Sequence, residues 1–168
     1  MSKSYVLLVA VALSFPVLAD TTEEKISLAM SAAPAHISGE ATIQDDDGTL
    51  LRKGSNGYTC MPGSGSPMCS DAVWGKLDEA MKNKADFSTD RIGISYMMQG
   101  DSEPGSNDSP DATDQTKGAW VKEGPHLMII VPNELLKGLP SDPASGLPYV
   151  MWKDTPYAHI MVPVGARK

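Results

Sequence analysis

The sequence predicts an α+β fold with a mostly antiparallel sheet of about six strands, two to three packed helices and one disulfide. Two observations lead to this prediction. Some segments carry apolar residues at helical spacing, whereas others alternate apolar and polar residues as half-buried strands do. Most of the expected strands are also separated by short turn sequences rather than by helices, which favours antiparallel pairing of neighbours.

Residues 1–19 have the pattern of a signal peptide rather than of a folded element. Lys3 is followed by the apolar run YVLLVAVALSF and then by the small-residue cleavage pattern VLA. The apolar run is shorter than a comfortable bilayer crossing requires. We therefore expect cleavage before Asp20, export to the periplasm or the extracellular space, and a single α+β domain over residues 20–168 without a membrane span.

The charge balance narrows the classes of partner. The chain has 14 basic and 21 acidic residues, a formal net charge of −7. An acidic domain gains no counterion release from the phosphates of nucleic acid or anionic lipid. We therefore expect no nucleic-acid partner, which leaves an unknown small ligand or another protein.

Helix signals occur at three places. Thr21 and Glu24 form a T-x-x-E capping box, apolar residues then repeat at helical spacing, and Pro34 ends the segment. Ser70 is expected to cap a second helix, and Asn133 a third element of one or two turns. The expected helices span about 22–33, 70–84 and 133–138.

Strand signals occur in six segments. Asp47-Gly48 lies between ATIQ and TLLR and favours a two-residue type I′ hairpin turn. In RIGISYMM, Ile92, Ile94 and Tyr96 would share one face. Residues 100–118 are acidic and rich in Ser, Pro and Gly, which is typical of a long mobile loop or lid. The expected strands are 41–44, 49–52, 91–98, 126–132, 149–152 and 157–164.

Cys60 and Cys69 flank a Gly/Ser/Pro-rich loop and are the two cysteines of the chain. In an exported protein such a pair predicts a disulfide. Closing a loop of this size stabilises a domain by roughly 2–3 kcal/mol on the chain-entropy model. The alternative is a thiolate metal site, which would need histidines at close spacing, and none is close in the sequence.

Three strings in the chain are specific: DDDGTLLRKGSNGYTC, GPHLMIIVP and YVMWKDTPYAHIMVP. With them the chain resembles a family of uncharacterised exported bacterial proteins that carry the motifs DxDGTxLRxGSNGYTC and YVMWKxTPYAHIMVP. The resemblance covers nearly the whole expected domain. It implies a secreted or periplasmic protein and carries no assigned activity, so it transfers no catalytic residue.

Asp45 and Asp47 stand in the string D-x-D-G-T-L, which resembles the motif of haloacid-dehalogenase-type phosphatases. There the first carboxylate is the nucleophile and the second the acid/base, and a lysine and further acidic residues that hold Mg²⁺ complete the site. Such an enzyme places the nucleophile after a buried parallel strand, whereas GEATIQ is short and polar. We therefore interpret the pair as a hairpin turn, with a phosphohydrolase as an alternative.

His126-Leu127-Met128 and His159-Ile160-Met161 are two H-x-M units, each in an expected strand. Residues i and i+2 of a strand share a face, so each unit presents an imidazole together with a thioether. If the strands are neighbours, these four ligands would suit monovalent copper. Core packing by methionine and a catalytic role for either histidine are the other interpretations. Further methionines that could join a copper site are Met61, Met68, Met97 and Met98.

These patterns favour a secreted or periplasmic binding or interaction domain over an enzyme. Copper is the one cofactor that they suggest. The acidic residues of 100–118 could supply oxygen ligands to calcium, but their spacing does not match an EF-hand. Tryptophan and tyrosine residues along the chain could line a cleft for a small ligand or serve as ordinary core and rim residues.

Overall fold

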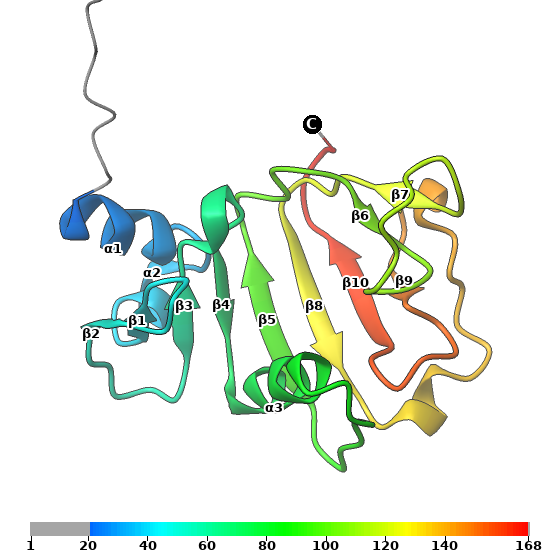
Figure 1. Ribbon diagram of the computed structural model, residues 1–168, viewed down its shortest axis with the longest axis horizontal. Helices are drawn as coiled ribbons and strands as arrows, with labels where there is room; N and C mark the ends of the chain where they lie inside the picture. Colours follow the sequence, from blue (N-terminus) through cyan, green and yellow to red (C-terminus); the bar gives the residue numbers. More distant parts are fainter. Residues whose placement is uncertain (1–20, 168) are drawn as a thin grey trace, which may run out of the picture.

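The computed structural model describes residues 21–167, so the expected signal peptide lies outside the described residues. The described chain forms an eight-stranded sheet in the order β2-β1-β3-β4-β5-β8-β10-β9 and a separate two-stranded sheet, β6-β7 (Figure 1). The α+β prediction with a mostly antiparallel sheet is therefore confirmed. The large sheet contains β1 Thr42–Gln44, β2 Leu50–Arg52, β3 Thr59–Met61, β4 Met68–Ser70, β5 Gly93–Met97, β8 His126–Ile130, β9 Tyr149–Met151 and β10 His159–Pro163; the small sheet contains β6 Gly105–Ser106 and β7 Trp120–Val121.

Within residues 21–167, three α-helices and three short 3-10 turns accompany the sheets. The T-x-x-E capping box forms as predicted, because Thr21 accepts from the backbone of Glu24 and the Glu24 side chain accepts from the backbone of Thr21. The second predicted helix begins one residue later than expected: Asp71, not Ser70, accepts from the first backbone N–H groups. The helices are α1 Thr22–Met30, α2 Ala35–Ser38 and α3 Ala72–Lys82, and the 3-10 turns are Gly63–Gly65, Asn133–Leu136 and Pro143–Ser145. Among the described residues, no helix has the length and apolar character needed to cross a membrane.

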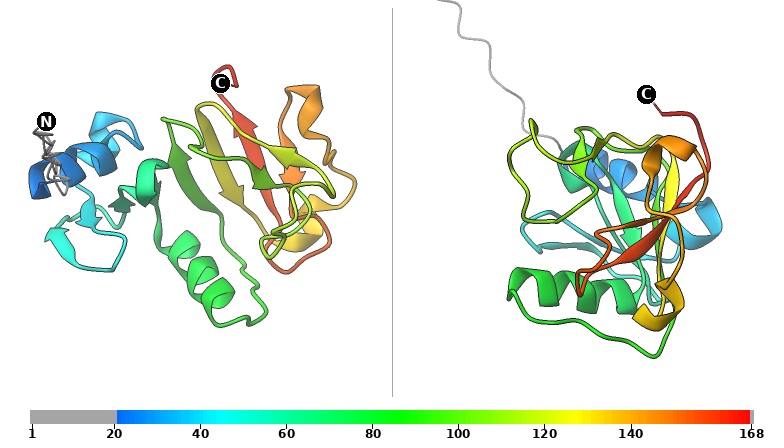
Figure 2. Two further views of the ribbon diagram at one scale, coloured as in Figure 1. Left: turned by 45° about the horizontal axis from the view of Figure 1, so that its top comes forward. Right: turned by 90° about the vertical axis from the view of Figure 1, so that its right-hand side faces the viewer.

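Different elements cover the two faces of the sheet (Figures 1 and 2). On one face, Trp74 and Leu77 of α3 and Val121 of β7 pack against the strands β5, β8, β10 and β9. On the other face, α1 and α2 cover the strands β1, β3 and β4, where Ile43 and both cysteines are buried. The sheet therefore has two sides with separate cores, and the larger core lies under α3 and the β6–β7 hairpin.

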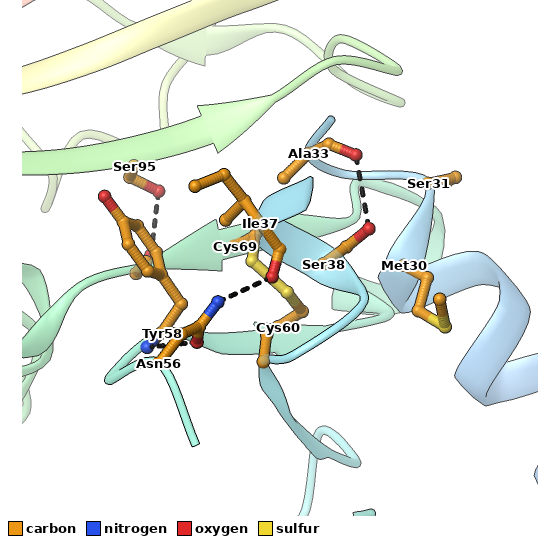
Figure 3. The surroundings of a disulfide bond; sticks show 12 residues. Met30, Ser31, Ala33, Ile37, Ser38, Asn56, Tyr58, Cys60, Cys69 and Ser95 are labelled. Atoms are coloured by element: carbon orange, nitrogen blue, oxygen red, sulfur yellow. Dashed lines mark hydrogen bonds between the residues drawn. A yellow bond between two sulfur atoms is a disulfide. The ribbon is translucent and has the colours of Figure 1, made fainter. Parts of the chain in front are cut away.

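The predicted disulfide between Cys60 and Cys69 is confirmed. The two cysteines face each other directly in the β3–β4 ladder, and both are fully buried against α1 and α2. Figure 3 shows the bond beside Ile37 of α2, whose carbonyl oxygen accepts from the side-chain amide of Asn56. The disulfide therefore joins neighbouring strands on the α1–α2 side of the sheet.

Four strands were not expected from the sequence. β3 and β4 are short segments on either side of the disulfide loop, and β6 and β7 are shorter still. Their hydrophobic alternation covers too few residues to be read as a period. β6 also lies inside the segment 100–118 that was expected to be a loop.

The predicted type I′ turn was wrong, whereas the alternation predicted for residues 91–98 is confirmed. The β1–β2 hairpin turns through Asp45–Gly48, closed by a hydrogen bond from Gly48 N–H to the Asp45 carbonyl. Only Gly48 has a positive φ, 87°, in this turn, whereas a type I′ turn needs positive φ at both central residues. In β5 the buried residues are Gly93, Ser95 and Met97, and Ile92 is 63% exposed. The alternation was correct, but the more buried face carries the smaller side chains because α3 packs closely against it.

Candidate functional site

One face of the sheet gathers two histidines and four methionines. Strand alternation places the two residues of each H-x-M unit on this face, and adjacent strands add a methionine at each side. All six side chains are nearly or fully buried. This set, called the His–Met face below, consists of Met97 on β5, His126 and Met128 on β8, Met151 on β9, and His159 and Met161 on β10.

A cavity of about 380 Å³ lies over the His–Met face, and all six residues line it. Its other walls come from the acidic segment, through Asp101, Glu103 and Ser106, and from Trp152 at the end of β9. The segment expected to be a loop or lid thus covers this cavity. The four ligands proposed from the sequence lie on one face and border one space, because Met128 of β8 pairs with Met161 of β10.

Hydrogen bonds define the tautomer of the two imidazoles. The Nδ1 atom of His126 lies 2.8 Å from the Gly124 carbonyl oxygen, and that of His159 lies 3.0 Å from the Tyr157 carbonyl oxygen. A carbonyl only accepts, so each Nδ1 carries the proton and donates it. Each Nε2 then keeps a free lone pair, which is the tautomer that a metal-ligating histidine has when its other nitrogen is tied to the backbone.

Both Nε2 atoms are buried and have no hydrogen-bond partner within residues 21–167. Leaving a buried polar atom unpaired costs about 1–3 kcal/mol, and native proteins rarely do so without a reason. Here two such atoms belong to side chains that line one cavity. The third unpartnered side-chain atom of the described chain, Oδ1 of Asn107, belongs to the segment that covers the cavity.

Aromatic rings enclose His159. Its imidazole meets the rings of Trp74 and Trp152 edge-on, with centroids 5.1 Å and 4.9 Å away. Burial lowers the pKa of His159 to about 4; the hydrogen bond to Tyr157 opposes this shift, and the nearby His126 adds to it. His159 is therefore a neutral base, with its Nε2 lone pair available, across the physiological pH range.

A carboxylate stands on the His126 side of the cavity. Asp101 accepts from the Glu123 backbone N–H at 2.8 Å, and its own N–H donates to the Glu123 carbonyl. Burial raises the pKa of Asp101 above its ordinary value, and the hydrogen bond from Glu123 and the neighbouring His126 oppose only part of this shift. Gly100 makes this close approach possible: it has a φ of 71°, and a Cβ atom there would lie 2.7 Å from the Glu123 carbonyl oxygen. The acidic segment thus begins with a carboxylate near the buried imidazole.

The other methionines named from the sequence separate into two groups. Met97 lines the cavity, whereas Met61 and Met68 line a different one and Met98 lines neither. Met151 was missed, although it belongs to the YVMW strand beside the second H-x-M unit. The signal that could have found it is the predicted hairpin of that strand with the next, which places Met151 opposite His159.

Asp45 and Asp47 lie in the β1–β2 hairpin and do not line the His–Met cavity. The Asp45 carboxylate pairs with Lys25 of α1 at 2.5 Å, and Asp47 accepts from the Thr49 backbone at 2.8 Å. β1 pairs antiparallel with β2 and parallel with β3. The two carboxylates thus have structural contacts in a turn near the edge of the sheet.

Two further cavities are larger, but no histidine of the described chain lines either of them. One, of about 580 Å³, has Lys137 and Lys153 in its wall, and the other, of about 420 Å³, has Met61, Met68 and Asp78. Neither holds an unpartnered buried side-chain atom of the described residues. No cluster of three or more His, Cys, Asp or Glu side chains in the range 21–167 is placed to hold a metal ion. The side chains of the His–Met face that could bind a metal are two imidazoles and four thioethers.

Comparisons of the chain with protein-family models, with curated proteins and with solved structures gave no match.

Proposed function

We propose that this chain is an exported binding protein for monovalent copper, with His126, Met128, His159 and Met161 as ligands. Met97 and Met151 join them on the same face. The observation that carries the proposal is the pair of buried Nε2 atoms, each with a free lone pair, in a cavity lined by thioethers. Thioether and imidazole ligands together select a soft ion of low charge.

The ligand set also favours copper(I) over divalent ions. Divalent ions of the first transition row bind well to imidazole with carboxylate or water, whereas thioethers favour copper(I). Four thioethers border the cavity, and they carry no charge. Asp101 lines the same cavity, where it accepts a hydrogen bond from the Glu123 backbone N–H. A soft monovalent cation therefore fits the donor atoms of the site.

Core packing alone accounts less well for the arrangement. Methionine often fills irregular cores, and these four side chains do contribute to the core. Packing gives no reason, however, to bury two imidazoles whose Nε2 atoms have no partner among the described residues. A leucine or phenylalanine at these positions would avoid that cost.

Export of the protein is part of the proposal. It is supported by the signal-peptide pattern of residues 1–19 and by the disulfide, since disulfides persist in oxidising compartments. The bound ion would thus be handled outside the cytoplasm, in the periplasm or beyond it.

The test is an anaerobic titration of the purified protein with copper(I) against a chromophoric copper(I) chelator, with ascorbate as reductant. We expect the protein to withdraw copper(I) from the chelator and to bind copper(II) and zinc(II) far more weakly. The variant Met128→Leu/Met161→Leu keeps the side-chain volume but removes two thioethers. It should lose at least tenfold in affinity.

The matched controls are Met98→Leu and His36→Asn, which change a methionine and the third histidine outside the cavity. Both should bind as the wild type does. If the wild type withdraws no more copper(I) than a variant with His126→Asn, His159→Asn, Met128→Leu and Met161→Leu together, the proposed function is wrong.

A further inference from the structure

The strand register gives the His–Met face a local two-fold symmetry. Met128 of β8 lies directly opposite Met161 of β10 in an antiparallel ladder. An axis between these two residues, perpendicular to the sheet, exchanges β8 with β10. Because β5 pairs antiparallel with β8 and β9 with β10, the same axis exchanges β5 with β9.

The symmetry relates the ligands in pairs. His126 corresponds to His159, since each lies two residues before the central methionine of its strand. Met97 lies opposite His126, and Met151 lies opposite His159. The hydrogen bonds follow the same rule, because each Nδ1–H donates to the carbonyl of the residue two positions earlier.

Each half therefore holds one imidazole and two thioethers. Residues directly opposite in an antiparallel pair have Cβ atoms about 5 Å apart, and diagonal neighbours lie about 7–8 Å apart, within reach of long side chains. Met161 is diagonal to His126, and Met128 is diagonal to His159. The His126 half is defined here as His126, Met97 and Met161, and the His159 half as His159, Met151 and Met128.

The register also separates the backbone positions of the two histidines. His126 pairs with Pro163, which lies four residues beyond His159 on β10. Strand geometry then puts the two histidine Cα atoms about 14 Å apart. A single ion about 2 Å from both Nε2 atoms would require both rings to lean far along the sheet. Each ring donates from Nδ1 to the carbonyl two residues earlier, which lies farther from the central methionine pair. These hydrogen bonds hold each ring at its own end of the face.

We propose that the face binds two monovalent copper ions, one in the His126 half and one in the His159 half, with the central methionine pair between them. This inference rests on the proposed function and adds its stoichiometry and its two sites. The halves differ in their covering: Trp74 and Trp152 enclose His159, whereas Asp101 lies near His126.

The experiment is native mass spectrometry, with elemental analysis, of the disulfide-intact protein after anaerobic loading with excess copper(I) and desalting. The variants are His126→Asn and His159→Asn. Asparagine retains a side-chain donor near the position of Nδ1 but lacks the Nε2 ligand. Met97→Leu and Met151→Leu each remove one thioether from the same two halves. They replace the histidine variants if those do not fold.

We expect two ions per wild-type chain, one per chain in each single-half variant, none in the double histidine variant and two in the His36→Asn control. One ion per wild-type chain would overturn this inference and leave the proposed function standing. No ion in the wild type would overturn both. Loss of both ions in either single-half variant would also overturn the assignment, because the halves would then not be separate sites.

Discussion

The indole of Trp152 donates its Nε1–H to the carbonyl oxygen of Ser106 at 2.9 Å. The backbone N–H of Trp152 also donates to the Asn107 carbonyl at 2.8 Å. Trp152 has a φ of 54°, a left-handed conformation that a bulky residue adopts only when its surroundings enforce it. These contacts fasten the segment that covers the cavity to the end of β9.

Replacing Trp152 with phenylalanine should therefore destabilise the protein. The change keeps an aromatic ring but leaves the buried Ser106 carbonyl without this donor, which costs about 1–2 kcal/mol. Urea unfolding followed by circular dichroism measures the loss. Trp120→Phe is the control, since the Trp120 indole donates to the Lys117 carbonyl within an exposed turn. Equal stability of the two variants would contradict the role given to Trp152.

Replacing Arg167 should lower the free energy of unfolding, because it leaves the buried Glu123 carboxylate without its cationic partner. The Glu123 carboxylate is fully buried and accepts from the Arg167 guanidinium at 2.5 Å and 3.1 Å, and from Tyr149 at 3.1 Å. Removing one partner of a fully buried pair costs about 3–5 kcal/mol. Because the Arg167 side chain is 36% exposed, we expect about 2 kcal/mol for Arg167→Met in chemical unfolding.

Two further variants test this explanation. Arg91→Met removes a cation from an exposed pair 4.0 Å from Asp90 and should leave stability unchanged. Adding Glu123→Gln to Arg167→Met removes the stranded charge and should restore part of the lost stability. If the second substitution destabilises the protein further, an unpaired buried charge is not the cause.

The stability of the metal-free protein should fall in mild acid because of His159. Its pKa is about 4 in the folded chain against 6.5 for an ordinary histidine, mainly through burial. The unfolded chain binds this proton first, so stability is full above pH 6.5 and falls as the pH drops toward 4. The loss at pH 5 is about 2 kcal/mol.

The measurement is the difference in unfolding free energy between wild type and His159→Asn at pH 7 and at pH 5. Trp74, Trp152 and Met151 around His159 carry no charge, and His126 is the titratable neighbour that acts on it. The difference should shrink at the lower pH. A pH-independent difference, or a shift equal to that of His36→Asn, would contradict a buried neutral His159.

The disulfide should support the fold without affecting the proposed copper site. Replacing both Cys60 and Cys69 with alanine reopens a loop with a sequence separation of 9, at a cost of about 2–3 kcal/mol. Cys69 aligns with Tyr96 on β5, whereas Met97 at the next position faces the cavity. The variant should therefore unfold at lower urea but keep its copper stoichiometry. Loss of copper at temperatures where the variant remains folded would contradict this separation.

Much of the candidate site follows from the sequence, because strand periodicity is local. The H-x-M units, their shared faces and their placement in strands need only the alternation of side chains and a short hairpin. The position of Met151 follows from the pairing of β9 with β10, two strands that are close in sequence and joined through the turn KDTP. The adjacency of β8 and β10 depends on β9 forming the edge, and no local pattern specifies that order.

Other features depend on contacts between distant segments. Trp74 reaches the site from α3 and lies 54 residues before Met128 of β8, whose carbonyl accepts its indole N–H. The cover over the cavity depends on Gly100 passing close to the Glu123 carbonyl and on the tie from Trp152 to Ser106. The turn type at Asp47-Gly48 could not be predicted either, because one dipeptide fits several turn types and the pairing of the flanking strands selects among them.

The disulfide also determines which sulfur atoms can compete for a metal. Cysteine thiolate is a charged and stronger ligand for copper(I) than a neutral thioether, so two free thiols would draw the ion away from the sheet face. With Cys60 and Cys69 oxidised, the described chain has no free cysteine, and methionine is its remaining sulfur donor. Thioethers also resist the pairwise oxidation that disables thiols. If the protein binds copper as proposed, oxidation of the cysteines leaves the ion to a weaker, more exchangeable set of ligands.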